Sequence, residues 1–349
     1  MYKQHSKKEI QSHRKDEHFF IAQKFYQKTN DNFKEIRFIH NGLPEIKLNE
    51  IDINPYIFNW KFPFYINAMT GGSKQTKKIN ASLAKISKET GIAMAVGSQN
   101  IAINYPELIE TFKIVRNINP NGFIMGNISA NSNLKEAIKA IKMINANALQ
   151  IHINVAQEIV MPEGDKSFMW LKNISKIIKN INIPVIIKEV GFGMSKQTIS
   201  TLKKIGTKYI DISGRGGTNF IQIENERRND KDYSFLYNWG QSTIESLIES
   251  QKYQKEINIF ASGGVKNPLD IIKCLRLGAK SVGLSGVILN SLLKNGEYKT
   301  IQMINKWKLE IIKIMAVLGA HNIHELRHKD IILSCHLLNY IKQRNLKII

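Results

Sequence analysis

The sequence predicts an α/β fold of the TIM (β/α)8 barrel type, and three observations lead to this prediction. Eight short apolar runs alternate with amphipathic, Lys-rich segments between about residues 60 and 318, as is typical of repeated βα units and a parallel sheet. The number and spacing of these units fit a TIM barrel. Almost every apolar run ends in glycine or polar residues, as expected where strands enter the loops that form a barrel's active site.

The predicted strands are short apolar runs, each followed by turn-forming or polar residues. In chain order they are FYINAM (64–69), IAMAVGS (92–98), FIMGNIS (123–129), ALQIHIN (148–154), PVIIKEV (184–190), YIDIS (209–213), NIFAS (258–262) and SVGLS (281–285). The segments between them have helical periodicity. In residues 133–144, Leu134, Ile138, Ile141 and Ile144 recur at spacings of three and four, so we expect this stripe to face the barrel.

A chain of 349 residues is long enough for one large α/β domain. We predict a single domain over residues 1–349, with an N-terminal extension (1–59), the barrel (60–318) and a short helical C-terminal tail (319–349). A doubly wound Rossmann sheet is the alternative, but its GxGxxG phosphate motif is missing. GRGGTN (214–219) and GFGMSK (191–196) have Asn and Lys, respectively, where the last glycine belongs.

The composition, with 43% hydrophobic and 23% charged residues, is that of a soluble globular protein. The first twenty residues are charged throughout, and no uncharged stretch is long enough to span a bilayer. We therefore expect a cytoplasmic protein with no membrane partner. Cys274 and Cys335 have no CxxC spacing, so neither a disulfide framework nor a thiolate zinc site is indicated.

The formal net charge of +21 raises the question of nucleic-acid binding. Lys residues are scattered along the whole chain, however, and the sequence is rich in Lys, Ile and Asn together, which indicates a biased composition. We therefore expect no nucleic-acid partner. A small anionic substrate would use the same positive field more locally, by being steered into a cleft.

The fourth predicted strand and the segment after it, QIHINVAQEIVMPEGD (150–165), combine an apolar face with a polar one. Successive strand residues point to opposite faces, so Ile151 and Ile153 share one face while His152 and Asn154 share the other. In the next strand Lys188 lies opposite Ile187 and is expected to point into the barrel mouth. A buried lysine is rare because removing an ammonium group from water is costly unless an anion offsets it.

Two further motifs suggest ligand sites. SGGV (262–265) and GLSG (283–286) end strands seven and eight, where barrels commonly bind phosphate through backbone N–H groups. HELRH (324–328) matches the HExxH zinc motif, in which two histidines share a helical face. It lies after the eighth strand without a good third ligand, so we interpret it as a coincidence on a surface helix.

Several of these motifs together resemble the type 2 isopentenyl-diphosphate isomerases, which are FMN-dependent TIM barrels of this length. The resemblance covers most of the chain, and the strand-four and strand-six motifs are its most specific parts. The motifs are RKDEHF (14–19), AMTGG (68–72), VGSQ (96–99), GNISA (126–130), QIHINVAQEIVMPEGD (150–165), KEVGFGMS (188–195), DISGRGGTNFIQIEN (211–225) and ASGGVKNPLDIIKCLRLGA (261–279).

The resemblance implies an isomerase that interconverts isopentenyl and dimethylallyl diphosphate, a small-molecule substrate, by moving a double bond without net redox change. It also implies reduced FMN, Mg²⁺, NADPH or another reductant, and a homo-oligomer, either a tetramer or an octamer. The residues that would hold FMN are Ala68, Met69, Thr70, Ser98, Asn127, Lys188, Ser213, Thr218, Gly263, Gly264, Ser285 and Gly286.

By the same resemblance, Arg14, Lys15 and His18 would bind the diphosphate side, Asn154 and Gln157 the substrate, and Glu158 the magnesium ion. Arg14 can form a bidentate fork and Lys15 acts as a point charge. Mg²⁺ prefers one or two carboxylates together with phosphate oxygens and water, so a single glutamate suffices. Lys188 beside the N1/C2 carbonyl edge of a flavin would stabilise the anionic reduced ring.

An unactivated alkene must gain a proton at one carbon and lose one at another, and side chains alone are poor acids for this. The N5 position of reduced flavin is therefore the expected proton donor or acceptor. The candidate residues for relaying or positioning the second proton are His152, Gln157 and Glu224. Some family members have Arg where this chain has Asn100, so no direct substrate contact is assigned to that side chain.

Two alternative functions stay open at this point. The chain is compatible with another FMN-dependent barrel oxidoreductase, such as a 2-hydroxyacid oxidase or a relative of inosinate dehydrogenase. It is also compatible with a tRNA-modifying flavoenzyme, which would show strongly salt-dependent RNA binding.

Overall fold

Eight parallel strands close into a barrel in the computed structural model, which describes residues 7–26 and 30–348. Each strand pairs with its neighbours in sequence order, and β9 closes the ring on β2. This confirms the predicted barrel class and all eight strands. The strands are β2 (Phe64–Ile66), β3 (Met94–Ala95), β4 (Ile124–Ser129), β5 (Ala148–His152), β6 (Val185–Lys188), β7 (Tyr209–Asp211), β8 (Asn258–Ser262) and β9 (Ser281–Leu284).

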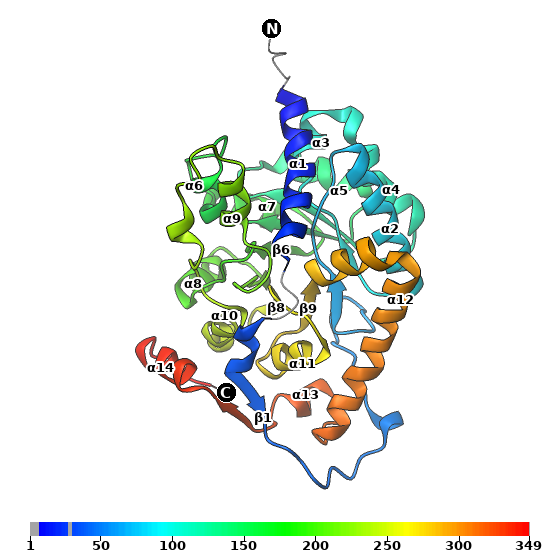
Figure 1. The fold of residues 1–349 in the computed structure, drawn as a ribbon, viewed down its shortest axis with the longest axis vertical. Coiled ribbons are helices and arrows are strands. Elements are labelled where there is room, and N and C mark those ends of the chain that lie inside the picture. The colour runs from blue at the N-terminus through cyan, green and yellow to red at the C-terminus, as the bar shows by residue number, and fades with distance from the viewer. Residues whose placement is uncertain (1–6, 27–29, 349) are drawn as a thin grey trace.

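Helices follow every strand and surround the barrel (Figure 1). The outer helices are α2 (Lys74–Thr90), α3 (Asn100–Asn104), α4 (Glu110–Ile118), α5 (Leu134–Ile144), α6 (Val155–Val160), α7 (Leu171–Asn180), α8 (Lys196–Lys204), α9 (Phe220–Glu226), α10 (Thr243–Ser250), α11 (Pro268–Arg276) and α12 (Gly286–Val317). Short 3₁₀ turns complete the loops at Asp31–Glu35, Leu48–Glu50, Pro106–Leu108, Ser234–Leu236 and Gln251–Tyr253.

The stripe predicted for α5 is wrong in one respect. Ile138 is 37% exposed, whereas Ala137 and Ala140 are fully buried together with Ile144. Small alanines bring the helix backbone close to the barrel, and a pattern based on large side chains misses that contact. The helix begins where expected, because the Asn133 side chain accepts a hydrogen bond from the Glu136 backbone N–H at 3.1 Å.

Side chains along each strand divide between two hydrophobic cores, as the alternation of a strand requires. Ile124, Ile151 and Ile187 join the core between the barrel and its helices. Met125 and Ile186 belong to a second core inside the barrel. The same alternation places the polar residues of the C-terminal strand ends inside the barrel.

An aromatic cluster closes the N-terminal end of the barrel. Phe58 stacks on Phe123 with ring centroids 5.3 Å apart, and Trp60 lies 5.2 Å from Tyr65 and 5.9 Å from Phe260. Such rings fill the taper of a barrel and exclude water from its interior. The cluster therefore seals the end opposite the loops that follow the strands.

The N-terminal extension and the C-terminal tail meet at the periphery. Strand β1 (Ile36–Phe38) pairs antiparallel with β10 (Ile331–Leu333), between α13 (Ile323–Leu326) and α14 (Cys335–Gln343). Helix α1 (Lys7–Lys24) contacts α2, α3, α9 and α12, which follow different strands of the barrel. Figure 1 shows α1 crossing in front of the barrel between α9 and α2. The extension therefore covers the C-terminal rim of the barrel in its own chain.

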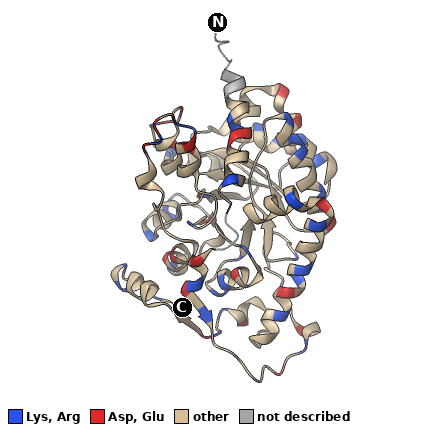
Figure 2. Cartoon of the chain, in the orientation of Figure 1, with Lys and Arg blue, Asp and Glu red and all other residues tan. Residues whose placement is uncertain are grey.

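Charged residues are spread over the molecule. Figure 2 shows Lys and Arg on helices on several sides of the fold. Within residues 7–26 and 30–348, no helix combines the length and the apolar character needed to cross a bilayer.

Candidate functional site

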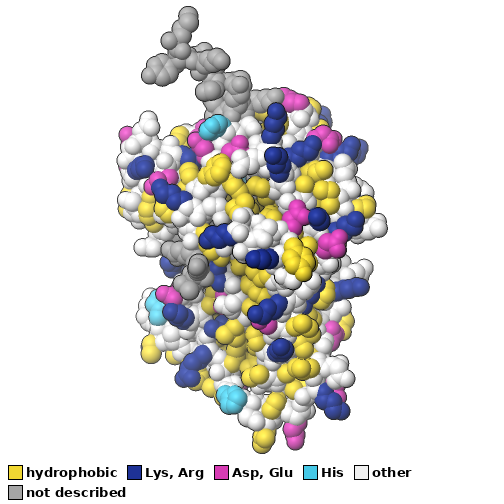
Figure 3. Space-filling model, turned by 45° about the vertical axis from the view of Figure 1, so that its right-hand side comes forward, with side chains coloured by type: hydrophobic (Ala, Val, Ile, Leu, Met, Phe, Trp, Pro, Cys, Tyr) yellow, Lys and Arg dark blue, Asp and Glu magenta, His cyan; other side chains and the backbone are white. Residues whose placement is uncertain are grey.

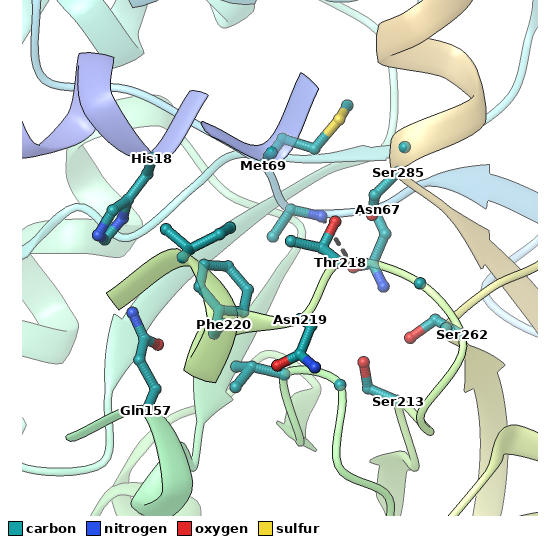
Figure 4. Close-up of a pocket in the computed structure, with 18 of the residues that line it drawn as sticks. His18, Asn67, Met69, Gln157, Ser213, Thr218, Asn219, Phe220, Ser262 and Ser285 are labelled. Atoms are coloured by element: carbon teal, nitrogen blue, oxygen red, sulfur yellow. Dashed lines mark hydrogen bonds between the residues drawn. The ribbon is translucent and has the colours of Figure 1, made fainter. Parts of the chain in front are cut away.

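A large pocket opens at the C-terminal ends of the strands, where the fold predicts the active site. Its volume is about 610 Å³, and residues from α1 and from the loops after the barrel strands line it. Figure 4 shows His18 and Gln157 at one end and Ser213, Ser262 and Ser285 at the other. The predicted residues that line it are Arg14, Lys15, His18, Ala68, Met69, Thr70, Ser98, Asn127, His152, Asn154, Gln157, Glu158, Lys188, Ser213, Thr218, Gly263, Gly264, Ser285 and Gly286.

Glycines form one end of the pocket. A Cβ atom on Gly263 would lie 2.0 Å from the Gly214 carbonyl oxygen, and one on Gly217 would lie 2.8 Å from the Gly264 nitrogen. Gly263 and Gly264 also have φ angles of +102° and +75°, which residues with side chains rarely adopt. The loops after β7 and β8 therefore approach each other backbone to backbone, which leaves N–H groups accessible to a ligand.

Helix α1 supplies positive charge to the opposite end. Arg14 lies 3.3 Å from Glu163, but its Nε atom is buried without a hydrogen-bond partner among the described residues. Burial and the charge of Arg14 lower the pKa of Lys15 to about 8, although Glu224 partly opposes this. Two cations held this close, one of them with an unsatisfied donor, form a site suited to an anion.

Glu224 does not line the pocket but lies behind its wall. It is fully buried, and its carboxylate accepts a hydrogen bond from Gln157 Nε2 at 2.7 Å and lies 2.9 Å from His18 Nε2. Burial alone would raise the pKa of Glu224, but hydrogen bonds from His18 and Gln157 and the charge of Arg227 lower it to about 2. This carboxylate therefore stays ionised and orients two residues that do reach the pocket.

Arg227 is a charged residue beside the pocket that the sequence analysis did not identify. Its guanidinium donates to Glu224 at 2.6 Å, to Glu17 of α1 at 2.9 Å and to Glu163 at 2.8 Å. It therefore joins α9, α1 and the loop after α6, and holds α1 over the pocket. Its position three residues after Glu224 is the only sequence signal, since such pairs are adjacent on a helix.

The residues after β5 form a compact polar group at the pocket wall. Asn154 Nδ2 donates to Glu158 Oε1 at 2.8 Å and to Gln157 Oε1 at 3.2 Å. The other carboxylate oxygen of Glu158 accepts the Asp165 backbone N–H at 2.8 Å. A carboxylate has about four acceptor positions, so Glu158 keeps free lone pairs toward the pocket.

Lys188 is 6% exposed and its ammonium group lines the pocket. Nζ donates to the Glu189 carbonyl oxygen at 2.8 Å and lies 3.9 Å from Asp211 Oδ2. Burial raises the pKa of Glu189 to about 7, although three backbone N–H groups, including that of Gly191, donate to its carboxylate. The turn after β6 is therefore fixed by Glu189, and Lys188 is held at the pocket floor.

Asn100 uses its side chain within the protein. Its Oδ1 accepts from Ser98 Oγ and from the Ser129 backbone N–H, both at 2.9 Å, and its Nδ2 donates to Ser132 Oγ at 2.6 Å. It lines the pocket, but these bonds direct its polar atoms to neighbouring loops. Asn100 thus acts as a brace between the loops after β3 and β4.

The HELRH segment (324–328) begins in the short helix α13 and ends in the turn after it, away from this pocket. The rings of His324 and His328 are edge to face, with centroids 5.1 Å apart. Among the described residues, no group of three His, Cys, Asp or Glu side chains is placed to hold a metal ion. The candidate functional side chains described above lie at the C-terminal rim of the barrel.

Comparison with known proteins identifies relatives along almost the whole chain. The family model of the FMN-dependent dehydrogenases matches residues 106–333. An isopentenyl-diphosphate delta-isomerase of Latilactobacillus sakei subsp. sakei (strain 23K) is 53% identical over 98% of this chain and 99% of its own length. A protein of the same name from Staphylococcus aureus (strain Newman) is 48% identical over 96% of this chain and 97% of its own.

Solved structures share the fold at much lower identity. A mutant flavocytochrome b2 with pyruvate bound aligns with a TM-score of 0.68 and 19% identity, over 92% of this chain and 84% of the other. A mandelate oxidase mutant with a monooxide FMN adduct aligns with a TM-score of 0.61 and 13% identity, over 91% and 92%. At these identities the likeness shows a common barrel fold.

Proposed function

The chain belongs to the isopentenyl-diphosphate delta-isomerases and contains an FMN-dependent dehydrogenase domain, and on this premise we propose its reaction, cofactors and site residues. It interconverts isopentenyl and dimethylallyl diphosphate by a 1,3-allylic proton shift, with reduced FMN and Mg²⁺. One observation carries the proposal: a single pocket has a glycine-lined backbone cradle at one end and a half-buried Arg14–Lys15 pair at the other. Two phosphorylated molecules can therefore bind in it together.

The glycine end fits the phosphate of FMN. Side chains would fill the space at Gly263 and Gly264, and the Arg215 Nε atom beside them is buried without a partner among the described residues. We propose that Ser285 and Gly286, at the start of α12, complete this cradle. Lys188 would then interact with the electron-rich edge of the flavin, with the main chain of 68–70 and the Asn127 side chain along its ring.

The α1 end fits a diphosphate. Arg14, Lys15 and His18 converge on the pocket from one helix, and Arg14, although it lies 3.3 Å from Glu163, has a buried Nε atom without a hydrogen-bond partner among the described residues. Glu158 lies across the pocket from α1 with free lone pairs, as a Mg²⁺ ligand shared with phosphate oxygens requires. Asn154 and Gln157 lie beside it and would contact the substrate.

Bound reduced FMN would supply the acid–base and charge-stabilising chemistry that an unactivated alkene needs. The protein residues orient the substrate, exclude water and hold the second proton. His152 and Gln157 line the pocket and can do so directly, whereas Glu224 acts through Gln157 and His18. Helix α1 covers the pocket, which lowers its exposure to water and strengthens electrostatic interactions within it.

Other parts of the proposal concern the whole protein. We propose NADPH as a source of electrons for FMN, a cytoplasmic location, a single domain and a homo-oligomer, either a tetramer or an octamer. The β1–β10 ribbon that joins the extension to the tail supports the single domain. Exposed apolar residues on α12, among them Tyr298 and Leu309, support association. Figure 3 shows hydrophobic side chains interspersed with Lys and Arg on one face of the molecule.

The proposed activity is tested by anaerobic incubation of the FMN-loaded, dithionite-reduced protein with isopentenyl diphosphate and Mg²⁺. We expect dimethylallyl diphosphate to form, and no conversion would refute the proposed reaction. Oxygen uptake with 2-hydroxyacids, or salt-sensitive binding of tRNA without isomerisation, would instead support one of the two alternative flavoenzymes.

A further inference from the structure

A chain of buried amide side chains crosses the barrel interior at the pocket floor and begins at Asp211. This residue is fully buried, and four donors converge on its carboxylate. Oδ1 accepts from Ser262 Oγ at 2.7 Å and from the Ser213 backbone N–H at 3.2 Å, while Oδ2 accepts from Asn67 Nδ2 at 2.8 Å and from Tyr65 OH at 3.1 Å. All four of these hydrogen bonds are donated to the carboxylate oxygens.

The direction of the chain is fixed at its second member. Asn67 donates through Nδ2 to Asp211, and its Oδ1 accepts the Ala68 backbone N–H at 2.8 Å. A backbone N–H can only donate, so the amide cannot be turned around without losing both bonds. The same Oδ1 accepts Gln150 Nε2 at 3.2 Å, which orients the next amide in turn.

The chain ends on a pocket residue. Gln150 Oε1 accepts Asn127 Nδ2 at 3.1 Å, so Asn127 Oδ1 faces His152 Nδ1 at 2.8 Å. An amide oxygen only accepts, so the proton in this last bond belongs to Nδ1 of the histidine. In a neutral imidazole the second nitrogen, Nε2, is then an acceptor.

Nearby charges favour the neutral ring. Burial, followed by the charges of Lys15 and Lys188, lowers the pKa of His152 to about 3, although a hydrogen bond with the Ile128 backbone opposes this. The ring lines the pocket, and Nδ1 is engaged by Asn127. Which nitrogen carries the single proton therefore determines whether His152 acts as a hydrogen-bond donor or as an acceptor toward a ligand.

We propose that Asp211, Asn67, Gln150 and Asn127 are positioning residues that fix His152 as the neutral Nδ1–H tautomer, with Nε2 presented to the ligand as a hydrogen-bond acceptor. His152 would then accept from an O–H or N–H group or take up a proton, and would not donate to a phosphate oxygen. This proposal specifies the role of His152 further, and it rests on the proposed function only for the identity of the ligand. The tautomer itself can be measured without turnover.

The test is NMR of the full chain carrying ¹⁵N- and ¹³C-labelled histidine, with His152→Gln used to assign the His152 signals. Two-bond ¹H–¹⁵N correlations distinguish the Nδ1–H from the Nε2–H tautomer. We expect the wild type at pH 7.5 to show Nδ1–H alone, and an Nε2–H or doubly protonated ring would overturn the proposal. The result is independent of whether the isomerase assay succeeds, so the two failures are distinguishable.

Variants test whether the chain is responsible. Gln150→Met interrupts the chain without removing Asn127, so it should populate the Nε2–H tautomer. Asp211→Asn weakens only one of the two bonds that orient Asn67, so it should do so to a smaller extent. Ser262→Ala removes a donor to Asp211 outside the chain and should leave His152 unchanged. If Asp211→Asn does not fold, Gln150→Met decides. A folded Gln150→Met variant with the wild-type tautomer would show that the amides do not control His152.

Discussion

A methyl group added at Gly264 should weaken FMN binding far more than one added at a matched glycine elsewhere. Gly264 has φ +75°, and a Cβ there would lie 2.5 Å from the Gly216 carbonyl oxygen. Gly296, at the kink of α12, has φ +78° and no heavy atom within 4 Å of a built Cβ. Both substitutions to Ala put a side chain at a positive φ, which costs about 1–3 kcal/mol, but only the first must push two loops apart.

The difference in FMN affinity between the two variants can be estimated from the hydrogen bonds of the glycine-lined cradle. Displacing the Gly264 backbone removes at least one charge-assisted hydrogen bond to a phosphate, worth about 1.5–3 kcal/mol. At about 1.4 kcal/mol per tenfold change, Kd for FMN should rise roughly 10- to 150-fold in Gly264→Ala and stay near the wild-type value in Gly296→Ala.

Flavin-fluorescence titration measures Kd, and urea unfolding of the apoproteins measures the shared loss of stability. Equal FMN affinities in the two variants would refute the assignment of the phosphate to this cradle.

Three further predictions concern the opposite end of the pocket. Glu158→Gln should raise the Mg²⁺ concentration needed for half-maximal turnover while FMN stays bound; an unchanged magnesium dependence would remove Glu158 as the ligand. Arg14→Lys keeps the charge but loses the fork, so KM for isopentenyl diphosphate should rise roughly tenfold or more, whereas Arg37→Lys, at an exposed position of strand β1, should have no effect. The carboxyl pKa of Glu224 is depressed from 4.5 to about 2, so its stabilisation is present above pH 4.5 and lost as the pH falls toward 2. Urea titrations should show the wild type losing ~1.4 kcal/mol more than Glu224→Gln between pH 6 and 3.5, and parallel losses would contradict this.

The barrel could be predicted from the sequence because every strand has a recognisable local pattern. Apolar runs followed by glycine or polar residues mark each βα unit, and alternation within a strand predicts which side chains enter the barrel, as at His152 and Lys188. Strand ends were less predictable. β3 spans only Met94–Ala95 of the expected 92–98 because Gly97 leaves the sheet and bonds its N–H to the Thr70 carbonyl.

Contacts between distant segments could not be predicted from the sequence. Nothing local indicates that Arg227 would bind Glu17 and Glu163, because these pairs depend on how α1 lies across the rim. Nor does local sequence place Glu224 behind the pocket wall. A glutamate in a motif gives no indication whether it contacts the ligand itself or a residue that contacts the ligand. Asn67 and Gln150 lie on predicted inward faces, but their pairing across the barrel requires the closed ring.

The proposed function requires that the double bond of the substrate move within this pocket, with reduced flavin bound and without net redox change. The most direct measurement is the number of dimethylallyl diphosphate molecules formed per reduced FMN in anaerobic D₂O, followed by mass spectrometry alongside the flavin absorbance. We predict many products per flavin, deuterium derived from solvent in the product, and an absorbance spectrum that stays reduced throughout. A single product per flavin, with the absorbance returning to that of oxidised FMN, would contradict the account.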